Sequence, residues 1–144
     1  MSNSIQWRRW EKRKEIAGEA GVTVIDSPRD LSPDLATLHN EFPFSNVYQR
    51  PTFNLRSREF TNGSSLTALG CVVSKMRVHI NGTLNVGGIR TEITEGIIYM
   101  SIYATFPTGH NAMLIAKDSS ANVTTKDRRR QDRNMSQLAE AKQL

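Results

Sequence analysis

The amino-acid sequence predicts an α+β, β-rich protein: an antiparallel sheet, sandwich or partly open barrel with two short N-terminal helices and a disordered basic C-terminal tail. Three observations predict this fold. Apolar and polar residues alternate over residues 66–80, as in a half-buried strand. Asn81-Gly82 follows, and a two-residue type I′ hairpin prefers this dipeptide. Residues 97–106 are apolar on both faces, as in a central strand. The expected parts are a basic aromatic arm (1–21), a β-rich globular domain (22–117) and a basic, largely disordered tail (118–144).

Two helices are expected near the N-terminus. The first covers residues 4–19, where the apolar positions form a loose stripe. The second covers about 33–41 and begins at Ser32-Pro33, because the missing N–H of a proline costs nothing in a first turn. It should end before Pro43, since the residue before a proline is disfavoured in the helical region.

The strands are expected from residue 46 onward. Residues 52–60 alternate in part, and Asn62-Gly63 is a turn signal. We expect a bend at Gly96 and a last strand over 112–116. Within 66–80 one face would hold Val72, Met76, Val78 and Ile80, and the other Lys75, Arg77 and His79.

Length and composition exclude several classes of protein. At 144 residues the chain is about one domain, and its single cysteine, Cys71, excludes an internal disulfide and a cysteine-rich zinc site. No stretch approaches the roughly 18 apolar residues that span a bilayer. The basic N-terminus lacks the apolar centre of a signal peptide. We therefore expect an intracellular protein, cytoplasmic or nuclear, with a membrane periphery or a virion as further locations, and not a secreted one.

The net charge of +5 resides at the two ends of the chain. Residues 1–15 hold five basic and two acidic residues, 118–144 hold six and four, and 16–117 hold eight of each. A neutral body with two basic arms indicates binding to a polyanion.

The arms hold the predicted binding residues for nucleic acid or an anionic surface. Arginines on a flexible tail neutralise phosphates without fixed geometry. The two tryptophans of the first arm could stack on bases, insert at a membrane interface or pack on the domain. The tail could instead be a solubilising segment or a nuclear-targeting patch. The predicted residues are Trp7, Arg8, Arg9, Trp10, Lys12, Arg13, Lys14, Lys126, Arg128, Arg129, Arg130 and Arg133.

A secondary basic sheet face is the third candidate. It would consist of Arg56, Arg58, Lys75, Arg77 and His79 on adjacent strands. The alternative is an ordinary solvent-facing surface, because Glu59, Glu92 and Glu95 lie in the same region.

Catalytic and metal sites find no support in the residue spacing. His39, His79 and His110 are scattered, without the spacing of zinc ligands. Cys71 lies on an apolar predicted strand and is expected to be a core residue instead of a nucleophile beside a base, and no glycine-rich phosphate loop occurs. The sequence therefore predicts no catalytic residue, metal, cofactor or small-molecule substrate.

In its layout the chain resembles small viral coat or matrix proteins, which have β-rich cores and mobile basic arms. The resemblance implies a non-enzymatic, self-assembling structural protein, a homo-oligomer whose arms contact nucleic acid or anionic lipid. Two alternatives remain open. One is a monomeric protein-interaction or regulatory module with a basic targeting tail that binds a protein partner. The other is a small α+β enzyme, which would need a cavity containing His39, His79 or His110.

Overall fold

A computed structural model describes residues 2–120 and Arg133, with the backbone alone for residues 2–9, 20 and 120. Every regular element within residues 2–120 is a helix. The α-helices are α1 (Ser2–Asp26), α2 (Pro33–Phe42), α3 (Leu55–Leu69), α4 (Val73–Asn85), α5 (Arg90–Tyr103) and α6 (Phe106–Ser120), with the 3₁₀ turn η1 (Ser27–Arg29) and the π-helical turn η2 (Pro43–Val47). The predicted β-rich sheet, sandwich or barrel is therefore wrong. The expected disorder of the basic tail concerns residues that, apart from 118–120 and Arg133, lie outside the described part.

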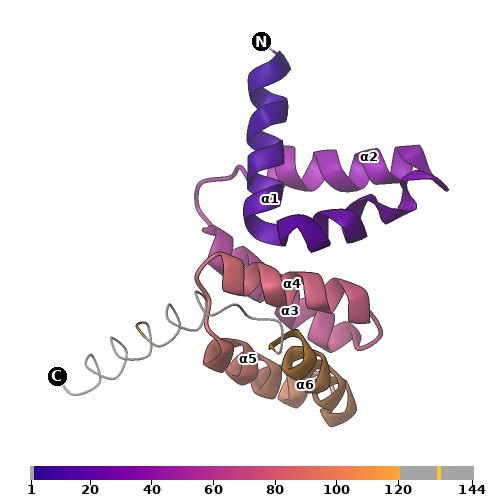
Figure 1. Cartoon of the computed structure of the whole chain (residues 1–144). Helices are drawn as coiled ribbons and strands as arrows, with labels where there is room; N and C mark the ends of the chain where they lie inside the picture. The colour runs from indigo at the N-terminus through magenta and orange to yellow at the C-terminus, as the bar shows by residue number, and fades with distance from the viewer. Residues whose placement is uncertain (1, 121–132, 134–144) are drawn as a thin grey trace.

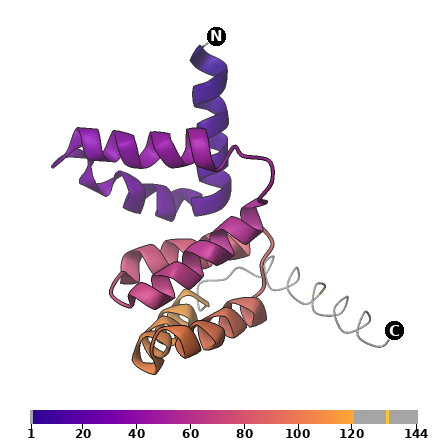
Figure 2. The same cartoon turned by 180° about the vertical axis from the view of Figure 1, so that it is seen from behind.

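The helices form three layers (Figures 1 and 2). The pair α3 and α4 occupies the middle layer. Helix α1 packs on α4 from one side, with α2 beside α1. Helices α5 and α6 pack together and contact α3 and α4 from the other side. The middle layer is thus covered on both sides.

Two apolar cores lie on opposite sides of α4. Met76 and Ile80 of α4 join Ile93, Ile97, Ala112, Ile115 and Ala116 of α5 and α6. Val78 of α4 joins Ile16, Ala17, Ile25 and Phe44 of α1 and η2. A helix that is buried on two sides carries apolar residues around much of its circumference. In α4 this places Met76, Val78 and Ile80 at every second position, which is also the period of a strand.

The glycine turn signals in the predicted hairpins lie inside helices. Asn81 and Gly82 belong to the last turns of α4, where Glu59 of α3 approaches the Gly82 backbone. Gly96 lies within α5 and faces the ring of Phe60, to which a β-carbon would be only 2.6 Å away. The hairpin and the bend are wrong because these glycines permit close contact between helices instead of turning the chain.

The expected N-terminal helices are confirmed in part. Helix α2 begins at Pro33, and the Ser32 hydroxyl accepts a hydrogen bond from the Leu35 N–H at 3.4 Å. The chain does not leave the helical region at Pro43 but continues through η2. Helix α1 extends to Asp26 and is kinked at Gly18.

The tract expected as a central strand is mostly α5. Ile97 is buried, but the opposite side of the helix exposes Tyr99, Ile102 and Tyr103. The prediction that both faces of this tract are buried is therefore wrong. Within the described residues, no helix is long and apolar enough to cross a membrane.

Candidate active site

A buried carboxylate links the helices of the middle layer. Glu59 of α3 is 0% exposed, although charged side chains are almost never fully buried unless they are paired. Its Oε1 accepts a hydrogen bond from the Tyr48 hydroxyl at 2.6 Å, and its Oε2 lies 2.8 Å from His79 Nδ1. These contacts compensate the carboxylate for the loss of water.

The imidazole of His79 is oriented by this carboxylate. His79 lies on α4, and its side chain is 26% exposed, so it joins the buried pair to a surface. Donation of Nδ1–H to Glu59 fixes the ring and leaves Nε2 as the second site for a proton. No other described residue forms a hydrogen bond to Nε2. This is the arrangement of a general acid or base with an orienting carboxylate.

Tyr48 and Asn62 complete the network. Asn62 Nδ2 donates to Tyr48 Oη at 2.8 Å and lies 3.4 Å from Glu59 Oε1. Burial raises the pKa of Tyr48, and the negative charge of Glu59 and its hydrogen bond raise this pKa further. The phenol therefore stays protonated and continues to donate to Glu59. Its ring stacks on Phe44 of η2, with centroids 5.1 Å apart.

A cavity of about 400 Å³ lies beside this network. Its volume is within the usual range for sites that bind small molecules. Helices α1, α2, α3 and α4 and the turn η2 all contribute to its wall. The polar lining residues are His39, Tyr48, Asn62, Ser65, Lys75 and His79, and the apolar ones include Ile16, Ala17, Ile25, Phe42, Phe44, Val47, Leu66 and Val78.

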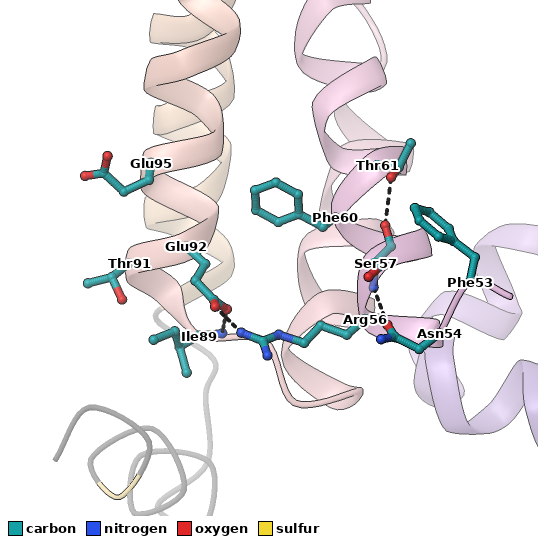
Figure 3. A pocket seen from close by; sticks show the side chains of 10 residues that line it. All are labelled: Phe53, Asn54, Arg56, Ser57, Phe60, Thr61, Ile89, Thr91, Glu92 and Glu95. Carbon is teal, nitrogen blue, oxygen red and sulfur yellow. Dashed lines mark hydrogen bonds and ion pairs between the residues drawn. The ribbon is translucent and has the colours of Figure 1, made fainter. Parts of the chain in front are cut away.

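A second cavity, of about 590 Å³, opens between α3 and α5 (Figure 3). Arg56 reaches across it and forms an ion pair with Glu92, whose carboxylate also accepts the backbone N–H of Ile89 at 3.1 Å. Among the described residues, no histidine, lysine, cysteine or tyrosine lines it. Since the charges of Arg56 and Glu92 neutralise each other, we assign the candidate active site to the cavity that His79 lines.

The residues of the predicted basic sheet face lie on two helices. Arg56 pairs with Glu92, and Arg77 of α4 pairs with Asp118 at 3.0 Å. Arg58 donates to the backbone carbonyls of Phe53 at 2.9 Å and Arg50 at 2.8 Å. A shared sheet face is wrong, because Arg56 and Arg58 lie on helix α3 and the other three residues on helix α4, not on adjacent strands. Lys75 and His79 alone of the five line the cavity.

The described cations of the N-terminal arm make internal contacts. Arg13 is 7% exposed, pairs with Asp26 at 3.0 Å, hydrogen-bonds to Asn40 and lies 4.8 Å from the centroid of the half-exposed Trp10 ring. Lys12 pairs with Glu15, and Lys14 with Glu19. Arg133 is exposed. Binding of a polyanion by these residues stays a prediction; the side chains of Trp7, Arg8 and Arg9, and all of Lys126, Arg128, Arg129 and Arg130, lie outside the described part.

The ion pair with Arg13 helps to lower the pKa of Asp26. Partial burial alone would raise the pKa of Asp26, but hydrogen bonds from Arg29, Arg13 and Asn40 and the charge of Arg13 outweigh this effect and lower the pKa. This cluster joins the end of α1 to α2 and thereby holds one wall of the cavity.

Sequence reasoning missed Glu59, Tyr48 and Asn62 as site residues. Read as helical, the sequence places Glu59 and Asn62 on one face, three residues apart, and Lys75 and His79 on another, four apart. No motif spacing joins the two pairs, because they meet through packing of α3 on α4. The residues from Ser2 to Ser120 contain no cluster of three or more His, Cys, Asp or Glu side chains that could hold a metal ion.

Comparison with known proteins points to an enzyme. Over 109 residues the chain is 28% identical to a protein named 4-carboxymuconolactone decarboxylase from Acinetobacter baylyi, and the match covers 75% of this chain and 81% of that protein. No family model matches the chain. The predicted non-enzymatic coat or matrix protein is therefore contradicted, as are its viral and β-rich character. The chain is similar to a decarboxylase, and its fold is helical.

Proposed function

We propose that this protein is an enzyme that decarboxylates a small, carboxylated lactone, with His79 as the acid-base residue. The observation that carries the proposal is the fully buried Glu59 carboxylate 2.8 Å from His79 Nδ1, at the wall of a cavity of about 400 Å³. The similarity to a protein named as a decarboxylase of such a compound supports it.

The reaction needs one proton and no electron carrier. The bond between the ring carbon and the carboxylate breaks, CO₂ leaves, and the electron pair spreads into the unsaturated lactone. The product forms when a carbon atom takes up a proton. His79, protonated on both nitrogens, donates the Nε2 proton, and Glu59 stabilises the imidazolium before the transfer.

The other groups of the network keep this pair in place. Tyr48 and Asn62 donate to Glu59 Oε1, which leaves Oε2 directed at His79. The apolar wall formed by Ile16, Phe44 and Val78 limits access of water to the site. A carbanion-like intermediate is then protonated by the positioned imidazolium.

The experiment is an assay of CO₂ release from 4-carboxymuconolactone by the purified protein. His79→Asn should lower kcat by about 10²- to 10⁴-fold, the usual contribution of a positioned acid or base. His110→Asn is the matched control, because His110 is exposed and does not line the cavity. Circular dichroism verifies that both variants fold. Absence of turnover by the wild type, or equal rates for His79→Asn and wild type, would overturn the proposal.

A further inference from the structure

Most described cationic side chains of the domain already have partners. Arg13 and Arg29 pair with Asp26, Arg56 with Glu92, and Arg77 with Asp118. Lys75 differs from these. It is partly buried, it lines the cavity of His79, and among the described residues no carboxylate forms an ion pair with it.

The position of Lys75 relative to the acid-base pair is set by α4. Lys75 lies four residues before His79, so the two side chains occupy the same face of the helix, one turn apart. The nearest buried carboxylate, Glu59, is held by Tyr48 and His79. Lys75 thus forms no ion pair with a described carboxylate and lines the same cavity as His79.

His39 of α2 also lines this cavity. Burial lowers the pKa of His39, and the positive charges of Lys75 and His79 lower it further. Lys75 thus supplies a positive charge to a cavity whose wall is largely apolar, and His39, whose lowered pKa favours the neutral imidazole, lines the same cavity.

We propose that Lys75, assisted by His39, forms a subsite that binds a carboxylate group of the substrate which the reaction retains. The inference rests on the proposed decarboxylation. An ammonium group that held the departing carboxylate would stabilise the substrate more than the transition state, in which that charge leaves the carboxylate. The cation therefore serves a second carboxylate of the substrate.

The kinetic test compares Lys75→Met with Lys75→Arg and with Lys117→Met. Lys117 is exposed on α6 and is the matched control. Loss of a charged hydrogen bond should raise KM by about 10- to 100-fold in Lys75→Met, with kcat within about threefold of wild type. Lys75→Arg should recover most of the affinity. Unchanged KM in Lys75→Met, or a fall in kcat at constant KM, would overturn the subsite.

The binding test separates this subsite from the reaction. Glutarate, a dicarboxylate that does not decarboxylate here, is titrated into each variant by calorimetry at constant ionic strength, with butyrate as the monocarboxylate comparison. The affinity for glutarate should exceed that for butyrate in the wild type and in Lys117→Met, and the difference should vanish in Lys75→Met. If these binding differences are found but the wild-type protein releases no CO₂, the proposed decarboxylation is refuted and the subsite is retained. Equal binding of both probes by wild type and Lys75→Met would refute the subsite.

Discussion

A β-carbon on residue 82 would lie 2.4 Å from Oε2 of Glu59, so Gly82 leaves the space that the buried carboxylate occupies. The same atom would lie 3.4 Å from Cγ2 of Ile16. The Oε2 atom cannot move away freely, because it also contacts His79. The close approach of α3 and α4 at Gly82 is therefore a condition for the Glu59–His79 pair.

Gly82→Ala should displace Glu59, lower the rate of decarboxylation by about tenfold or more, and destabilise the fold by about 1–3 kcal/mol through overpacking. Gly63→Ala is the control, since Gly63 lies within α3 and a β-carbon there meets nothing within 4 Å. It should raise the free energy of unfolding by about 0.5–1 kcal/mol. Urea unfolding and the CO₂ assay measure both variants. Wild-type activity and stability in Gly82→Ala would contradict the assigned role of this glycine.

The same residue shows where the sequence misleads. Asn81-Gly82 is a hairpin signal when only its neighbours in the chain are considered. A glycine is needed at this position because of Glu59, which lies more than twenty residues away in the sequence and on another helix. A local pattern cannot distinguish a glycine that permits a turn from one that permits a contact. Packing between distant elements determines which of these two roles the glycine has, and this packing is not visible in a short window of sequence.

Features governed by local chemistry were predictable. The start of α2 at Ser32-Pro33 follows from the capping hydroxyl and the proline of the first turn. The helical nature of α4 was not predictable, because burial on two sides gave Met76, Val78 and Ile80 the period of a strand. The candidate site was only partly visible in the sequence. His79 stands out there as a basic residue, whereas Glu59 is read only as an acidic residue that reduces the positive charge of its region.

Tyr48→Phe should weaken the site without removing its acid-base residue. The hydroxyl that donates to Glu59 at 2.6 Å is lost, so we expect a destabilisation of about 1–3 kcal/mol and a lower kcat. The raised pKa of Tyr48 gives an independent measurement. In an absorbance titration of the three tyrosines, the variant should lack the phenol that ionises at the highest pH. If the variant instead lacks a tyrosine that ionises near pH 10, Tyr48 is not buried against Glu59.

Asp26→Asn should loosen the junction of α1 and α2. Its carboxylate binds Arg13, which is almost fully buried, and we expect the variant to lose about 2 kcal/mol of stability at pH 7. The folded pKa of Asp26 lies below the unfolded value of 3.8, so its contribution is complete above pH 3.8 and is lost as the pH falls through the folded pKa. The difference in unfolding free energy between wild type and variant should therefore shrink in acid. A constant difference from about pH 7 to about pH 2 would exclude this ion pair as the cause.

Gly18→Ala should strain the kink of α1. Gly18 has φ 64° and ψ −177°, a conformation that is nearly exclusive to glycine and costs other residues about 1–3 kcal/mol. The kink frees the carbonyl of Ile16, which accepts a hydrogen bond from Asn85 Nδ2 at 2.9 Å, and directs Ile25 toward Val78 at the cavity wall. Loss of stability should therefore accompany a raised KM, whereas Gly63→Ala, in a straight helix, should leave KM unchanged. Thermal unfolding and the KM of both variants measure this, and a Gly18→Ala protein as stable as wild type would show that α1 does not need its kink.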